Sequence, residues 1–239
     1  MSTALPRNPE LQPTEHLRRL TTRACEVARA EAAAVARALN GEPALLDSVR
    51  QQEEELDTLD RQINEDVTAS ISQVSEPEAR ELLSCLKLVI ELERIGDLLL
   101  NVAIRVATVA GRIDAQDTAD LRHMAALLQS MLTDAAAAFS NRDLDRALAV
   151  LRADAEMDRL RNLMFVRHID NPENRPVQQS FHLVFVTQAL ERAGDHSKNV
   201  AEEVCHLVTG RSVRHLLRAS DKSDEEKFIE HLRRREFGR

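Results

Sequence analysis

The chain has 239 residues, of which 32 are Lys or Arg and 40 are Asp or Glu, and the formal net charge of -8 argues against a nucleic-acid-binding protein, which needs a positive field to meet phosphates. Six glycines, seven prolines, six phenylalanines and no tryptophan or tyrosine accompany abundant Ala, Leu, Arg and Glu. This composition favours helices over sheets and predicts an all-α fold.

The chain begins with MSTALPRNPELQPTEH, which lacks an apolar core of signal-peptide length, and no later stretch approaches the roughly 18 uncharged apolar residues of a transmembrane helix. Cys25, Cys85 and Cys205 lie far apart without metal-site or redox spacing. They are expected to be inert thiols packed between helices in a reducing compartment. We therefore expect a cytoplasmic protein.

Start and stop signals predict a first block of three long helices. The first is expected over residues 13–39, where an Asn-Gly pair ends it. The second is expected over 43–73, with a proline in its first turn. Ser75 and Glu78 have capping-box spacing and open the third helix, which is expected to end near Gly111.

A second block repeats this plan. Its first helix is expected from about Asp117 to a turn at 140–141, and its second over 143–169. A break at 171–176, which contains two prolines, precedes a sixth helix that is expected to end at Gly210. Short connections between helices of similar length favour antiparallel neighbours, so each block should be an up-down-up bundle.

The two blocks resemble each other in sequence. ELERIGDLLLNVA at 91–103 matches ALERAGDHSKNVA at 189–201, and LDTLDRQI at 56–63 aligns with MDRLRNLM at 157–164. Such self-similarity indicates duplication of a three-helix unit. The charged C-terminal stretch is expected to form a short amphipathic helix or a tail. The predicted division is into a first repeat, a second repeat and this charged segment: 12–113, 114–215 and 216–239.

Acidic residues recur at helical spacing in both repeats. Residues four apart lie on one helix face, and the third and sixth helices each carry a Glu-x3-Asp-x3-Asn row that continues an apolar stripe. The second and fifth helices each carry an acidic pair with the same spacing. If these helices face each other, the predicted metal ligands are Glu53, Asp57, Glu93, Asp97 and Asn101 in the first repeat, and Asp154, Asp158, Glu191, Asp195 and Asn199 in the second.

Partly buried carboxylates are costly unless they are paired or metal-bound. Arg94 and Arg192 lie about 100° around the helix from the acidic rows and are poorly placed to neutralise them. Oxygen ligands suit iron, manganese, magnesium or calcium, and the lack of Cys or His argues against a closed structural zinc site. Gly96 and Gly194 within the rows indicate close approach of a helix or ligand. The alternative is that these acids are solvated or paired with arginines.

These rows resemble the LERIGD…N signature of the phosphate-uptake regulator family, PhoU. The matching residues are Leu92 to Asp97 with Asn101, and Leu190 to Asp195 with Asn199; Ala193 replaces the isoleucine in the second copy. The resemblance extends over about residues 12–215. It implies two pseudo-symmetric three-helix bundles with metal clusters on their acidic faces, often of iron or zinc.

The resemblance also implies a function. Members of this family are cytoplasmic negative regulators that couple the ATPase of the phosphate ABC transporter to the phosphate-sensing histidine kinase, and they keep the phosphate-starvation response off when phosphate is plentiful. Such a protein would reach membrane complexes only through its partners. The metal (iron, manganese, zinc or magnesium) and a homodimeric state stay open. Asp60 corresponds to Arg161 in the second repeat, so the second metal cluster is expected to be weaker or filled differently.

Two alternatives come from other classes of protein. A ferritin-like di-metal carboxylate protein uses two Glu-x-x-His pairs, and Glu203 with His206 has this spacing; the other candidate, Asp120 with His123, has the shorter acid. A purely structural helical interaction module is the second alternative. The sequence shows no nucleotide-binding loop and no nucleophile with an adjacent base, so we expect a protein that is not an enzyme.

Overall fold

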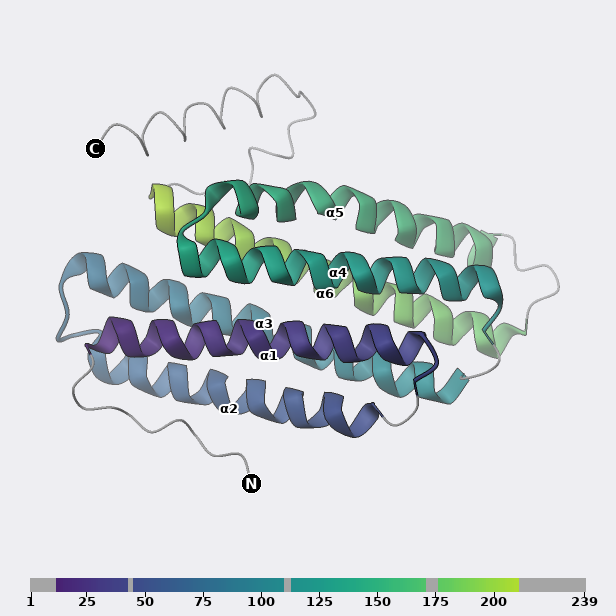
Figure 1. The fold of residues 1–239 in the computed structure, drawn as a ribbon, viewed down its shortest axis with the longest axis horizontal. Coiled ribbons are helices and arrows are strands. Elements are labelled where there is room, and N and C mark those ends of the chain that lie inside the picture. Colours follow the sequence, from purple (N-terminus) through teal and green to yellow (C-terminus); the bar gives the residue numbers. More distant parts are fainter. Residues whose placement is uncertain (1–11, 43–44, 110–112, 171–175, 211–239) are drawn as a thin grey trace, which may run out of the picture.

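A computed structural model describes residues 12–42, 45–109, 113–170 and 176–210, and these form helices and turns without a strand (Figure 1). The expected all-α fold of two tandem three-helix bundles is confirmed. The elements are α1 (Pro13–Leu39), α2 (Leu46–Ser70), α3 (Glu76–Val109), α4 (Ala115–Asn141), α5 (Leu144–Phe165), the π-helical turn η1 (Val166–Asp170) and α6 (Val177–Thr209). No described helix is long and apolar enough to cross a lipid bilayer.

The bundles α1–α3 and α4–α6 lie against each other along their length (Figure 1). Contacts between them run from α1 to α4 and from α3 to α6. The predicted boundary at residue 113 falls between α3 and α4, although the division into domains stays a prediction. The charged segment 216–239 lies outside the described residues.

Local signals set the helix ends. Glu78 accepts a hydrogen bond from the backbone N–H of Ser75 at 2.8 Å, which is one half of a capping box, and a second from the Ser75 hydroxyl at 2.6 Å. Asp114 caps α4 by accepting from the N–H of Asp117 at 2.7 Å. Gly210 ends α6 with a left-handed φ of 70°, a conformation that glycine adopts without steric cost. Residues 43–44, 110–112 and 171–175, which carry other predicted helix boundaries, are outside the described part.

The fifth helix differs from expectation at its end, because its last five residues form the wide turn η1. This turn brings two successive side chains to Asp117 of α4: Arg167 at 2.6 Å and His168 at 3.1 Å. The Asp117 side chain is fully buried, and a buried carboxylate requires such partners. The side chain of Ser180 on α6 is hydrogen-bonded to the other ring nitrogen of His168 at 3.1 Å.

The three cysteines are free thiols within the helical core. Burial raises the pKa of Cys25 and Cys205 to about 12 and that of Cys85 to about 11. Protonated thiols are poor nucleophiles and poor metal ligands, so the prediction of inert packing residues is consistent with their surroundings.

Candidate functional site

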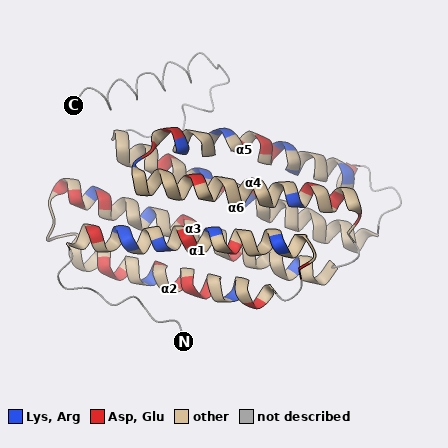
Figure 2. Ribbon diagram, viewed as in Figure 1, with Lys and Arg blue, Asp and Glu red and all other residues tan. Residues whose placement is uncertain are grey.

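Acidic side chains from α2 and α3 meet along one side of the first bundle. We call this set the first acidic face: Glu53, Asp57, Asp60, Glu93 and Asp97. All except the exposed Asp97 are half-buried, and acidic positions are dense along α2 (Figure 2). No lysine, arginine or histidine in the described part of the chain forms an ion pair with these five carboxylates.

The pKa shifts of Glu53 and Glu93 are consistent with a face that the two helices share. Burial, followed by repulsion from Asp97, Asp57 and Asp60, raises the pKa of Glu93 above its ordinary value. Burial and then repulsion from Asp57 and Asp97 raises the pKa of Glu53 likewise. Each carboxylate therefore lies near charges on the other helix, and protonation or a cation would relieve the repulsion.

A third helix contributes a carboxyl group that sequence reasoning missed. Glu31 of α1 is 0% exposed, and neither of its carboxyl oxygens has a hydrogen-bond partner among the described residues. Burial, followed by repulsion from Glu53 and Asp97, raises its pKa to about 9. Glu31 therefore lies behind the first acidic face, between α2 and α3.

Gly96 explains how Glu31 and α2 come so close to α3. A Cβ at this glycine would lie 2.7 Å from Cδ1 of Leu56 and 3.2 Å from Oε2 of Glu31. Any larger residue would press on both side chains, so the prediction of close approach at Gly96 is confirmed. At Gly194, its counterpart in α6, the atoms nearest to an added Cβ belong to Met157, whose Cγ would lie 3.2 Å away.

The second acidic face, formed by Asp154, Asp158, Glu191 and Asp195, differs because two basic side chains partly neutralise it. Arg161 pairs with Asp158 at 3.0 Å and with Glu191 at 3.4 Å. Lys198 forms an ion pair with Asp154. The pKa of Glu191 is still raised, by burial first and then by Asp195. The two acidic faces therefore differ in their ion pairs, and the expectation of a weaker second metal cluster stays a prediction.

The repeats also differ beneath these faces. Buried positions of α1 and α4 align in register, so that Leu17 matches Leu121, and Val35 matches Phe139. This register pairs Glu31 with Ala135. At the position that matches Glu31, the first helix of the second bundle therefore has no carboxyl group.

The two predicted asparagine ligands point elsewhere. The Asn101 amide donates to the backbone carbonyl of Asp97 at 2.9 Å and lies exposed to solvent. The Asn199 amide donates to the carboxylate of Glu91 at 3.0 Å, on α3 of the other repeat. Their role as ligands stays a prediction that requires a change of rotamer.

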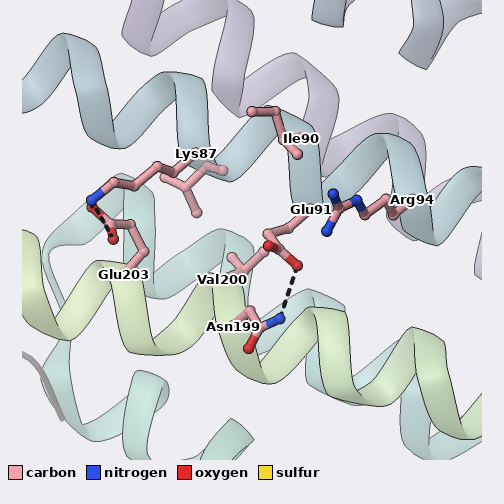
Figure 3. A pocket seen from close by; sticks show the side chains of 8 residues that line it. Lys87, Ile90, Glu91, Arg94, Asn199, Val200 and Glu203 are labelled. Carbon is pink, nitrogen blue, oxygen red and sulfur yellow. Dashed lines mark hydrogen bonds and ion pairs between the residues drawn. The ribbon is translucent and has the colours of Figure 1, made fainter. Parts of the chain in front are cut away.

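Asn199 lies instead at the seam between the repeats, where α3 packs against α6 around a cavity of about 170 Å³ (Figure 3). Glu91 is hydrogen-bonded to His196 at 2.7 Å, and Glu203 accepts from Ser84 at 2.7 Å and pairs with Lys87 at 3.2 Å. Acidic and basic groups are balanced here, which indicates a clamp between the bundles. The cavity is lined by Lys87, Leu88, Ile90, Glu91, Arg94, Asn199, Val200 and Glu203.

The Glu-x-x-His alternative finds no support in the geometry. Glu203 is engaged by Ser84 and Lys87, and Asp120 pairs with Arg167 at 2.7 Å. Within the described ranges, no three His, Cys, Asp or Glu side chains are gathered as a metal-binding group. Cation binding at either acidic face would therefore require side chains to change rotamer.

The first acidic face nevertheless fits a hard cation. Its donors are all carboxylate oxygens, Glu31 behind it has two unpartnered oxygens, and Gly96 leaves room where a Cβ would intrude. The second acidic face fits less well, because Arg161 and Lys198 already supply positive charge. Glu31 could have been found in the sequence as the one acid in the row Ala24, Ala28, Glu31, Val35.

Comparisons of the sequence with known proteins all point to one protein family. The sequence profile described as the PhoU domain matches residues 16–106 and again 121–204. The phosphate-specific transport system accessory protein PhoU homolog of Pseudomonas aeruginosa is 31% identical over 74% of this chain and 76% of that protein. The homolog of the same name from Rhizobium meliloti is also 31% identical, over 82% of this chain and 86% of its own length.

Solved structures show the same arrangement of helices. The crystal structure of PhoU from Pseudomonas aeruginosa superposes with a TM-score of 0.76 at 26% identity, and the match covers 83% of this chain and 98% of that one. The phosphate transport system regulatory protein PhoU from Streptococcus pneumoniae superposes with a TM-score of 0.67 at 21% identity, covering 84% and 97% of the two chains. The second likeness concerns the fold alone.

Proposed function

Because this chain belongs to the PhoU domain family, we propose that it is a cytoplasmic negative regulator of phosphate uptake and of the phosphate-starvation response. In this role it links the ATPase of a phosphate ABC transporter to a phosphate-sensing histidine kinase. It acts by binding these partners and not by catalysis. The observation that carries the proposal is the PhoU match over both repeats, together with relatives named as accessory proteins of phosphate-specific transport.

Deletion of the gene tests this function. In phosphate-rich medium, a reporter for phosphate-starvation genes should rise from its repressed level, because the link that reports phosphate sufficiency is lost. Complementation with the parent chain should restore repression. A deletion strain whose reporter stays repressed would remove the regulatory assignment.

We also propose that the first acidic face holds a hard cation, with Glu53, Asp57, Glu93 and Asp97 as its carboxylate ligands. Iron, manganese and magnesium suit such oxygen donors, with zinc as a further candidate from the family resemblance. This proposal is supported by carboxylates that repel one another and form no ion pairs within the described residues. Their repulsion contributes to the raised pKa values of Glu53 and Glu93. When bound, the cation would supply the positive charge that Arg161 and Lys198 supply in the second bundle.

Thermal melts with chelator, iron or manganese test this cation proposal. A cation that binds only the folded protein raises the melting temperature by mass action. Asp97→Asn should reduce that shift, and Asp195→Asn should reduce it less, because the second acidic face is already partly neutralised. A parent protein whose melting temperature responds to neither chelator nor metal would overturn the proposal.

A further inference from the structure

Glu31 is an exceptional group within the first bundle. It is fully buried on α1, and both of its carboxyl oxygens lack a partner in the part of the chain that the structure describes. Buried carboxyl groups are ordinarily hydrogen-bonded or paired, because the lost hydration must be replaced. Neither a packing role nor an ion pair accounts for a carboxyl group at this position.

The surroundings of Glu31 show where its carboxyl group is directed. Its Oε2 atom approaches Gly96 of α3 so closely that a Cβ there would lie 3.2 Å away, and Asp97 is the next residue along that helix. Glu53 on α2 and Asp97 on α3 are the two charges that act on it. The carboxyl group of α1 therefore points into the first acidic face from the core side.

We propose that Glu31 is the inner ligand of the cation bound at the first acidic face, so that α1, α2 and α3 all contribute a carboxylate to one divalent ion. This inference rests on the cation proposal above and adds a residue, a helix and a difference between the repeats to it. The second bundle has Ala135 at the matching position and positive side chains at its face. Only the first bundle can bind a cation with all three of its helices.

The carboxylates that would surround the cation explain why a glycine is needed at position 96. A cation bound by Glu31, Glu53 and Asp97 would lie against the backbone of α3 at Gly96, where any side chain would occupy the space. Leu56 fills the adjoining space and is itself fully buried, which closes the core side of the site. The predicted close approach at Gly96 and the unpartnered carboxyl group thus belong to one arrangement.

Titration calorimetry with Mn²⁺ on the full chain, after removal of metal by chelation, tests the proposal. The variants are Glu31→Gln and Glu31→Met, which keep the volume of the side chain but remove the carboxylate. Glu31→Met guards against misfolding of the amide variant, because it places an apolar group in an apolar site. Glu54→Gln is the matched control, because it makes the same chemical change at an exposed acid on α2 next to Glu53. Asp97→Asn reports on the first acidic face as a whole.

The expected result is that both Glu31 variants weaken the tighter Mn²⁺ site at least about tenfold, as loss of a ligand or of its supporting carboxylate does elsewhere. Glu54→Gln should bind within about twofold of the parent, a change expected from screened surface charge alone. If Asp97→Asn weakens binding while both Glu31 variants bind as the parent does, Glu31 is no ligand but the cation proposal stands. If the parent binds no Mn²⁺, both proposals fall together.

Discussion

At the scale of the residue, Glu31 shows how a core position can hold a carboxyl group without an ion pair. Its pKa, raised from 4.5 to about 9 by burial and then by Glu53 and Asp97, means that it carries a proton at neutral pH in the metal-free protein. The neutral form removes most of the cost of burial but leaves a polar group among apolar neighbours. A cation would replace that proton and satisfy the oxygens.

This raised pKa predicts a pH dependence of stability in the presence of chelator. Between about pH 4.5 and 9 the folded chain holds one proton on Glu31 that the unfolded chain has released. Stability is therefore highest below the ordinary pKa and falls as the pH rises, by up to about 1.4 kcal/mol per pH unit from this group alone. Urea denaturation of the parent and Glu31→Gln at pH 6, 7 and 8 measures it: the free energy of unfolding of the parent should fall more steeply.

Glu54→Gln is again the control for that experiment. Glu54 is exposed, so its replacement should leave the slope of the parent unchanged. The interpretation is wrong if Glu31→Gln and the parent lose stability in parallel across this range, since Glu31 would then have the same protonation in the folded and unfolded chains.

At the scale of the element, the two mid-helix glycines look alike in sequence and differ in what they face. The nearest neighbours of a Cβ at Gly96 are Leu56 and Glu31, and the nearest neighbour of one at Gly194 is Met157. Leu56 is fully buried and branched, so it has little freedom to turn away from an added methyl group. Methionine is unbranched and adapts to small changes of space.

We predict that Gly96→Ala lowers the stability of the protein and that Gly194→Ala does not. Alanine favours a helix by about 1 kcal/mol over glycine. At Gly96 this gain is outweighed by overpacking, which costs roughly 1–3 kcal/mol, so the variant should be less stable than the parent. At Gly194 Met157 can move aside, and the variant should be as stable as the parent or slightly more. Urea denaturation in chelator measures both; equal losses at the two sites would show that the glycines are equivalent.

The elements also show what the sequence could predict. Pro13 at the start of α1, the Ser75–Glu78 capping pair and Gly210 after α6 are local signals, and each lies where a helix begins or ends. The wide turn η1 was not predicted, because it depends on Asp117, a residue distant in the sequence that Arg167 and His168 must reach.

The candidate site likewise has parts that the sequence predicts and parts that depend on contacts between distant residues. The acidic rows on α2 and α3 follow from spacing within each helix, and the raised pKa values of Glu53 and Glu93 are consistent with a common face. The partner of Asn199, which is Glu91 in the other repeat, depends on how α3 crosses α6. Spacing within one helix carries no information on how two helices cross. From spacing alone, Asn199 therefore belongs to the acidic row of its own helix.

At the scale of the whole molecule, the seam between the repeats is built like a core and not like a loose domain contact. Leu88 of α3 and Val200 of α6 are both fully buried and line the same seam cavity. Around them, Glu91 and Glu203 are held by side chains of the opposite repeat or of their own helix. Burial would raise the pKa of Glu91, but hydrogen bonds from His196 and Asn199 outweigh it and hold that pKa below its ordinary value.

Such a seam predicts that both bundles unfold in one cooperative transition, although the chain is longer than most two-state domains. Leu88→Ala should lower the stability of the whole molecule by about 2–5 kcal/mol, because a fully buried leucine is truncated at the contact between repeats. Scanning calorimetry should show one peak at a lower temperature.

Met157→Ala, inside the second bundle, should shift that same peak, since neither bundle can melt without exposing the seam. Two resolved peaks in the parent, or a shift of only one peak in either variant, would mean that the repeats unfold independently.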